Sequence, residues 1–349
     1  NDEGTIKISG DNINYKSYLL TLNTLIFILV AIVLSSLCIG RYGIPITDAI
    51  KILLSKIFPI SKTWDQTMEN VIFNLRFPRV ISAILVGGAL SLSGASYQGI
   101  FKNPLVSPDL LGVSSGACVG AALAILWDAN ILGIQICAFL GGILAVIITT
   151  AVPKLLKNNS TIILVLAGVI VAGLMSSLLG MLKYVADTEI KLAEITYWQM
   201  GSLAKISKTN ILSVGPLMVF AAIVLIAMRW KMNVLSLGES EARMLGVDIG
   251  KMRLIVIVCS TILTSCAVCI SGTIGWVGLV VPHLGRMLVG PDNTKLMPVT
   301  LLIGAAFMLV IDTLARTLTK AEIPISILTG LIGAPFYFWM LVKQRMKLQ

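Results

Sequence analysis

The feature that most constrains this chain is a series of long apolar runs separated by short polar stretches. The runs at 18–39, 131–152 and 161–182 contain no charged residue, and each reaches the length of about 20 residues that an α-helix needs to cross a bilayer. A membrane β-barrel would instead show segments of about ten residues with alternating polarity. The chain is 56% hydrophobic and 13% charged, whereas soluble domains carry about 25% charged residues. The sequence therefore predicts a polytopic all-α membrane protein.

About ten such spans can be placed, so that residues 18–342 form one transmembrane domain between a polar tail at 1–17 and a basic tail at 343–349. An even number of crossings places both termini on one side of the membrane. We expect that side to be the cytoplasm, because the basic tail then faces inward. The predicted spans lie at 18–39, 76–97, from about residue 110 onward, 131–152, 161–182, 211–228, 254–270, 271–286, 298–311 and 323–342.

A polar segment, VLSLGESEARMLGVDIG at 234–250, interrupts this apolar pattern. Ser236 and Glu239 have the S-x-x-E spacing of a capping box, which predicts a short helix over 237–245. Gly246 would end that helix, because glycine readily adopts the left-handed conformation that follows a helix.

The helix predicted in this segment is amphipathic. Glu239 and Arg243 would form an i,i+4 ion pair on its polar side. Leu237, Ala242, Met244 and Leu245 would share the opposite, apolar side, and Glu241 falls among them. A carboxylate in an apolar face requires a partner. Two interpretations remain open, namely a loop helix lying on the membrane surface and a helix that fits into the cleft of another protein.

The predicted spans carry no ionisable side chain near their centres, and His283, Asp312 and Arg316 lie toward span ends. Carriers driven by protons or sodium ions generally need such groups at membrane depth, so a stand-alone secondary transporter is disfavoured. Residues 246–252 approach a phosphate loop but lack its spacing and the Ser or Thr after Lys251. We expect no catalytic residue in this chain, and energy from ATP would arrive through a separate subunit.

The basic and sulfur-containing residues indicate no further site. The Lys and Arg residues are scattered at the ends of apolar runs and form no basic stripe, which disfavours nucleic acid as a partner and favours lipid headgroups. Cys266 and Cys269 have C-x-x-C spacing inside an apolar segment without His or carboxylate neighbours. We therefore expect neither a bound metal nor a cofactor in this chain.

Glycine spacing predicts one close helix contact. Gly112, Gly116 and Gly120 recur every four residues, which places them on one face of a helix. Small residues on such a face let two membrane helices approach closely.

A faint internal repeat relates the two halves of the chain. Residues 79–94 and 253–272 both begin with Arg and end in Ser-Gly, and LAGVIVA at 166–172 resembles LTGLIGA at 328–334. The two copies are five spans apart, and an odd offset inverts one copy relative to the other. Inverted repeats are common in transporters.

Several longer motifs resemble those of one protein family. The motifs are RFPR at 76–79, SGASYQGIFKNPLVSPDLLGVSSGA at 93–117, LGESEARMLGV at 237–247, SGTIGWVGLVVPH at 271–283 and IPISILTGLIGAP at 323–335. On these motifs, the chain from Arg76 to Lys343 resembles the permease subunits of the FecCD family, the type II ABC importers for iron-siderophore, haem and cobalamin. The first 75 residues match this family in general character alone.

The resemblance implies a ten-span permease that dimerises with a second permease subunit, identical or paralogous, around a central path. Two ATPase subunits, which bind ATP and Mg, would dock on the cytoplasmic side of the bacterial inner membrane. An extracytoplasmic substrate-binding protein would deliver the cargo from the other side. The implied cargo is a ferric siderophore, with haem and cobalamin as the nearest alternatives and molybdate as a more distant one.

The resemblance also implies roles for individual residues. An E-A-x-x-x-G signature that inserts into a cleft of the ATPase corresponds to Glu241, Ala242 and Gly246. Arginines that accept glutamates of the binding protein correspond to Arg76, Arg79 and Arg316, for which anchoring in lipid headgroups is the alternative. The implied ATPase-coupling residues are Ser236, Glu239, Glu241, Ala242, Arg243 and Gly246.

A cytoplasmic gate and a translocation path are implied in the same way. The gate corresponds to Asn103, Pro104 and Leu105 and, by a looser match, to Ser160 and Thr161. The fifth and tenth spans would line the path, which places Met175 and Ser176 near it.

Overall fold

The computed structural model describes residues 15–157 and 160–346, and every regular element within these ranges is helical. The predicted all-α fold is therefore confirmed. Residues 1–14 of the predicted polar tail and 347–349 of the basic tail lie outside the described residues. The elements are α1 (Tyr15–Cys38), α2 (Ile46–Leu54), α3 (Gln66–Asn70), η1 (Val71–Arg76), α4 (Phe77–Phe101), η2 (Pro108–Leu111), α5 (Val113–Leu126), α6 (Ile131–Leu155), α7 (Thr161–Val185), α8 (Lys191–Met200), α9 (Lys208–Leu237), α10 (Glu239–Met244), α11 (Ile249–Ser271), α12 (Val277–Val289), α13 (Asn293–Thr317) and α14 (Ile325–Met346).

The predicted number of spans agrees with the structure, although several boundaries differ. Seven stretches of the described chain are long and apolar enough to cross a membrane, and three shorter apolar helices, α5, α12 and α14, bring the number to ten. The second span was predicted to begin too late, because α3, η1 and α4 form one helix of 36 residues from Gln66 to Phe101. The sixth was predicted to end too early, because α9 continues to Leu237.

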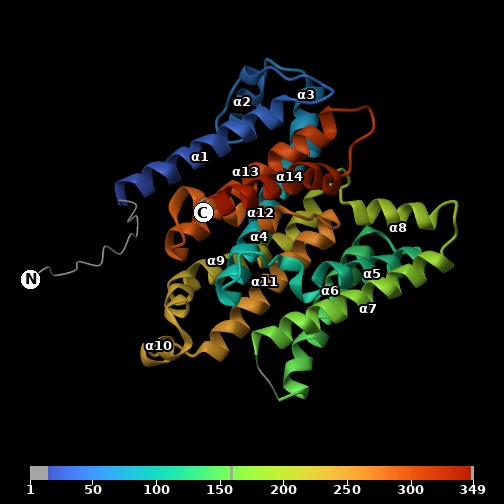
Figure 1. Cartoon of the computed structure of the whole chain (residues 1–349). Coiled ribbons are helices and arrows are strands. Elements are labelled where there is room, and N and C mark those ends of the chain that lie inside the picture. The colour runs from blue at the N-terminus through green and yellow to red at the C-terminus, as the bar shows by residue number, and fades with distance from the viewer. Residues whose placement is uncertain (1–14, 158–159, 347–349) are drawn as a thin grey trace, which may run out of the picture.

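The centre of the bundle is formed by α4 and α11 (Figure 1). In the most apolar stretch of each of these two spans, 83% and 72% of the residues are buried, whereas 6% are buried in the corresponding stretch of α1. Hydroxyl groups join the two helices, since Ser93 Oγ lies 3.0 Å from Thr264 Oγ1 and the Tyr97 hydroxyl lies 3.3 Å from Thr261 Oγ1. Interhelical hydrogen bonds of this kind help to hold membrane helices together.

The predicted glycine contact joins α5 to α6. A Cβ atom added at Gly116 would lie 2.6 Å from the Cβ of Ala145, and one added at Gly120 would clash with the carbonyl oxygen of Cys137. The prediction is thus confirmed for these two glycines. Gly112 has another role, because it lies between η2 and α5 with a φ of 79° and caps both elements.

The contacts between helices follow the predicted repeat, in which α4 to α7 correspond to α11 to α14. Helix α4 packs against α13 and α12, and α11 packs in the same way against α6 and α5. The pair formed by α5 and α6 has its counterpart in the pair formed by α12 and α13. This pattern agrees with the repeat expected from the sequence.

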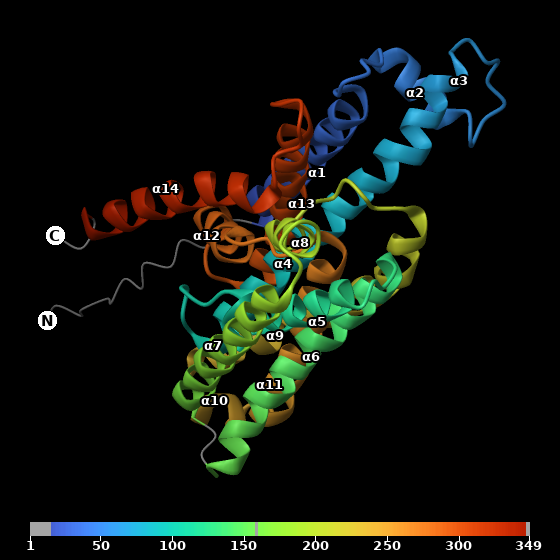
Figure 2. The ribbon, with the colours of Figure 1, turned by 90° about the vertical axis from the view of Figure 1, so that its right-hand side faces the viewer.

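The two polar regions of the chain lie at opposite ends of the bundle. In Figures 1 and 2, α2 and α3 are at the top, whereas α10 is near the bottom together with the N-terminal end of α7. The connection from α9 to α11 therefore faces away from the segment between α1 and α4.

We predict that Gly120→Ala lowers the thermal unfolding midpoint of the purified protein in detergent. Its new methyl group would meet the backbone of α6, and overpacking of this kind costs about 1–3 kcal/mol. Gly88→Ala on α4 is the matched control, because a Cβ there would make an ordinary contact of 3.5 Å with Leu301. Equal midpoints for the two variants would contradict the α5–α6 contact.

Candidate functional site

The segment predicted to couple the chain to an ATPase is a short, well-bounded helix. Helix α10 contains six residues and begins after Gly238, whose φ is 141°. The predicted capping box is wrong, because Ser236 lies in the last turn of α9, where its hydroxyl donates to the carbonyl of Asn233 at 2.6 Å. The predicted end is confirmed, because Gly246 has a φ of 77°. The side chain of Glu239 lies outside the described residues, so its pairing with Arg243 stays a prediction.

Glu241 finds its partners within the first turn of α10. The Ser240 hydroxyl donates to its Oε2 at 3.0 Å, and a bond from its own backbone N–H lowers the pKa of the carboxyl. An ionised carboxylate at this end of a helix is favourable, because the helix dipole is positive there. The carboxylate that seemed misplaced on the apolar side is therefore satisfied locally.

The apolar residues around α10 are divided between the bundle and the solvent. Ala242 is 0% exposed, whereas Leu237, Met244 and Leu245 are 66%, 79% and 57% exposed. The prediction that these four residues share one side is therefore wrong in part. The three exposed side chains belong to α10 and the residues next to it, at one end of the bundle.

A cavity of about 330 Å³ lies in the bundle between the middles of three long helices. Leu90 of α4, Ser176 of α7 and Thr264 of α11 contribute to its wall. Ser176 was predicted to lie near the path and lines this cavity, whereas Met175 is buried against α6. The polar side chains that line the cavity are Ser107, Asp109, Ser114, Ser115, Ser176, Gln199, Thr264 and Thr273.

Asp109 is a candidate functional residue that the sequence analysis missed. Residues 101–108 contain two prolines and lie between the second and third predicted spans, which is the sequence pattern of a turn. In the structure η2 folds back into the bundle, where Pro108 packs against Gly278 of α12 and the carbonyl of Leu110 packs against Gly168 of α7. Asp109 thus shares a cavity with residues from the middle of three spans. Asp109 belongs to η2 and to none of the predicted spans, so it does not test the expectation that no ionisable side chain lies near a span centre.

A second wall of the cavity is the non-helical stretch between α11 and α12. Gly201 and Gly272 both have positive φ, 76° and 71°, which lets the end of α8 lie directly against this stretch. Here the Ser202 N–H donates to the Ser271 carbonyl at 2.8 Å, and the Ile325 N–H donates to the Gly201 carbonyl at 3.0 Å. These bonds join α8, the cavity wall and the start of α14.

Trp276, at the end of this stretch, is strained. Its φ of 70° is uncommon for a bulky residue, and strain of this kind gathers at functional sites. A Cβ added at Gly333 of α14 would lie 2.6 Å from the Cβ of Trp276. The indole therefore packs under a bare stretch of α14, and it connects that helix to the cavity wall.

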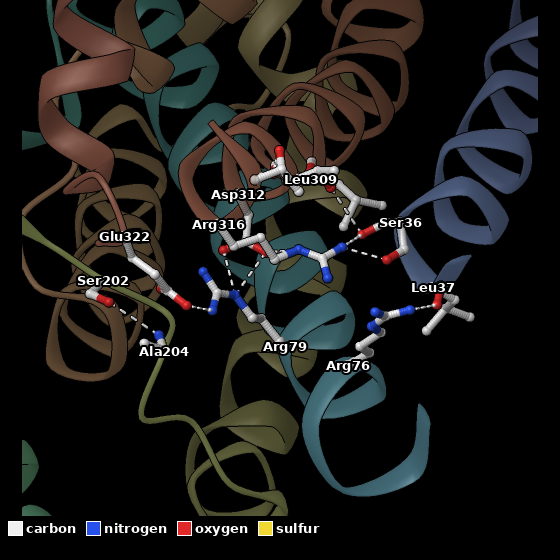
Figure 3. Close-up of polar contacts among 12 residues, drawn as sticks. Ser36, Leu37, Arg76, Arg79, Ser202, Ala204, Leu309, Asp312, Arg316 and Glu322 are labelled. Atoms are coloured by element: carbon white, nitrogen blue, oxygen red, sulfur yellow. Dashed lines mark hydrogen bonds and ion pairs between the residues drawn. The ribbon is translucent and has the colours of Figure 1, made fainter. Parts of the chain in front are cut away.

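The three arginines predicted to dock a binding protein have partners inside the chain (Figure 3). Arg76 is 6% exposed, and its Nη1 donates to the carbonyls of Leu37 at 2.6 Å and Cys38 at 3.0 Å. Arg316 donates to the carbonyl and the hydroxyl of Ser36. The last carbonyls of a helix have no partner within it, and α1 has no basic residue in its last turn. The two guanidinium groups therefore cap α1 from η1 and α13.

Arg79 is held by two carboxylates. Its Nε lies 2.8 Å from Asp312 Oδ1, and its Nη1 lies 2.9 Å from Glu322 Oε1. Arg316 Nε approaches the other oxygen of Asp312 at 3.9 Å. All three arginines are thus largely buried and bonded within the chain. Docking of a binding protein at these arginines stays a prediction.

The residues predicted to form a cytoplasmic gate lie at two helix ends. Asn103 follows the end of α4, and its Oδ1 accepts the N–H of Leu105 at 2.9 Å, which shapes an exposed turn through Pro104. Ser160 begins α7, where its hydroxyl accepts the N–H of Ile163 at 3.3 Å, and Thr161 is the first residue of that helix. Both segments are turn and cap structures, and the gate itself stays a prediction.

We predict that Asp312→Asn destabilises the protein strongly. The change leaves Arg79 and Arg316 without their shared carboxylate, and breaking a buried ion pair costs about 3–5 kcal/mol. Asp128→Asn is the matched control, because the Asp128 side chain is 81% exposed in its pair with Lys191 and surface pairs contribute about 0–1 kcal/mol. Thermal unfolding in detergent measures both, and equal unfolding midpoints would contradict the structural role of the arginine cluster.

Comparison with known proteins agrees with this arrangement. The family model described as the FecCD transport family matches residues 28–343. The molybdate import system permease protein MolB of Haemophilus influenzae is 41% identical over 320 residues, which cover 92% of this chain and 94% of that protein. A probable iron chelatin transport system permease protein of Helicobacter pylori is 41% identical over 280 residues, which cover 80% and 84%.

A solved structure is similar over almost the whole chain. The inward-facing conformation of a metal-chelate-type ABC transporter superimposes with a TM-score of 0.84 at 41% identity, covering 93% of this chain and 100% of that one. The match to the family model extends from α1 to α14. This chain belongs to the FecCD transport family.

Proposed function

We propose that this chain is the membrane-spanning permease of an ATP-driven importer that takes up a metal chelate, most specifically a ferric siderophore. A second permease subunit, two ATPase subunits and an extracytoplasmic binding protein complete the transporter. Haem or cobalamin is the alternative cargo. Membership of the FecCD transport family over residues 28–343 is the observation that carries this proposal.

The coupling role of α10 is supported by its surface. Helix α10 lies at the end of the bundle opposite α2 and α3 (Figure 2), and Met244 in this helix is exposed, as are Leu237 before it and Leu245 after it. The helix is bounded by Gly238 and Gly246, both with positive φ, and Ala242 packs it onto the bundle. When a partner subunit displaces a short helix held in this way, the displacement is passed to α9 and α11, which precede and follow it in the chain.

Contact with a second permease is supported by α7. A Cβ added at Gly173 or Gly180 would meet nothing within 4 Å, so small residues on this helix face outward. Membrane helices associate through faces of this kind. Ser176 lies between the two glycines and also lines the cavity, which would place the cavity beside the contact between the two permeases.

A secondary transporter is a second candidate, because Asp109 supplies an ionisable group to the cavity. A carboxylate that lines a cavity between membrane helices can bind a coupling proton or cation. The family relationship and the apolar surface of α10 favour the ATP-driven importer instead, and an uptake experiment separates the two.

We predict that uptake into proteoliposomes requires ATP and resists ionophores. The vesicles would hold this chain with its ATPase and receive binding protein loaded with labelled ferric siderophore, haem, cobalamin or molybdate. The proposal expects one iron chelate to accumulate with ATP in the presence or absence of an ionophore. Uptake that needs no ATPase and collapses with the ionophore would establish the secondary transporter instead.

We predict that Glu241→Arg abolishes ATP-driven uptake while the protein still inserts into the membrane. The substitution places a positive charge at the positive end of α10, where a carboxylate was stabilising, and it reverses the charge offered to the ATPase. Glu194→Arg on α8 is the matched control, because it is also an exposed glutamate but lies away from α10. Normal uptake by the Glu241→Arg variant would remove α10 from the coupling mechanism.

A further inference from the structure

The cavity contains one carboxylate and no basic side chain. Asp109 lines it, and none of the described residues that line it is Lys, Arg or His. Lys183 is not a lining residue, and its Nζ donates to Oε1 of the lining residue Gln199 at 2.6 Å. Among the described residues that line the cavity, Asp109 is therefore the one with a formal charge.

Two helices begin at this cavity, and Asp109 occupies the start of one. Helix α5 starts at Val113 and α12 at Val277, and a helix N-terminus attracts anions through its dipole and its free N–H groups. At α5 that position is taken, because Asp109 Oδ1 accepts the N–H of Ser114 at 2.8 Å. The protein therefore supplies its own anion where an oxyanion from solution would otherwise bind.

The backbone on both sides of Asp109 is held in place. A Cβ added at Gly278 would clash with the ring of Pro108, and one added at Gly168 would clash with the carbonyl of Leu110. These two residues flank Asp109, so α12 and α7 clamp η2 from both sides. The remaining polar wall is made of hydroxyl and amide groups, which bind neutral polar ligands.

We propose that Asp109 is a charge filter in the transport cavity, favouring neutral or cationic chelates that offer hydrogen-bond donors and disfavouring anions. The proposal rests on the proposed function, because it assumes that cargo passes this cavity. Three hydroxamate groups neutralise ferric iron, so a ferric trihydroxamate is neutral or, with an added amine, cationic. A ferric tris-catecholate carries three negative charges, and molybdate carries two. The filter therefore favours the hydroxamate class and opposes the other two.

The local charge is tested by the reactivity of a thiol placed in the cavity. Ser176→Cys is made in the intact transporter with its six native cysteines replaced by alanine. Cationic and anionic methanethiosulfonate reagents are then compared, first with Asp109 intact and then with Asp109→Asn. A unit charge that lines the same cavity as the thiol changes the local concentration of an ionic reagent several-fold. We expect Asp109→Asn to lower the cation-to-anion ratio of modification rates by about tenfold.

The control is Asp65→Asn, an exposed carboxylate before α3 that makes no side-chain cap, and it should leave the ratio unchanged. A ratio that Asp109→Asn does not alter would overturn the charge filter. Failure of both reagents to modify Ser176→Cys would overturn it as well, because a closed cavity cannot select solutes.

Transport then tests the consequence for cargo. With loaded binding proteins supplied in excess, Asp109→Asn should raise uptake of molybdate or ferric tris-catecholate relative to a neutral ferric trihydroxamate by about tenfold, in line with the change in local charge. Strong molybdate uptake by the unmodified chain would contradict the proposed cargo, and the thiol test would still decide the role of Asp109. Unchanged selectivity together with an altered thiol ratio would place the cavity off the transport path.

Discussion

Close approach of helix backbones at glycine is the interaction on which the rest of this structure depends. Apolar side chains gain little by leaving lipid for another helix, so membrane bundles rely on contacts that small residues permit. Gly87 packs against Gly304, Gly94 against Gly278 and Gly116 against Gly141, with no room for a Cβ at any of these contacts. They join α4 to α13 and α12, and α5 to α6. The central helices are therefore fixed where polar groups must later be aligned.

The cavity is a consequence of the same contacts. Gly168 and Gly278 press η2 between α7 and α12, which carries Asp109 away from the membrane surface and into the bundle. Gly201 and Gly272 bring the end of α8 against the neighbouring wall of the cavity. Trp276, which has a strained φ of 70°, packs in this wall against α14. A polar chamber can thus form inside a bundle whose long helices are almost free of charge. Its wall includes Ser176 and Leu179 of α7, and Trp276 connects it to α14.

The sequence was sufficient for the features that depend on local pattern. Apolar run length predicted the spans, the polar segment at 234–250 predicted α10, and four-residue spacing predicted the contact of Gly116 and Gly120 with α6. It was insufficient where distant segments meet. Ser236 could not be seen to belong to α9, and nothing in RFPR reveals that Arg76 caps a helix ending at Cys38. Asp109 follows a proline, and the sequence around it has the pattern of a turn. Its place inside the bundle depends on Gly168 and Gly278, which pack against η2 but lie 59 or more positions later in the sequence.

Transport, in this account, couples motion at α10 to a cavity bordered by α7 and α14. The most direct test of that claim is a structure of the intact transporter, with both permeases and both ATPases, determined by electron cryomicroscopy. The account predicts that Leu237, Met244 and Leu245 are buried in a cleft of the ATPase and that the cavity beside Asp109 opens toward the second permease. A complex in which α10 remains exposed to solvent, or in which this cavity faces lipid, would contradict it.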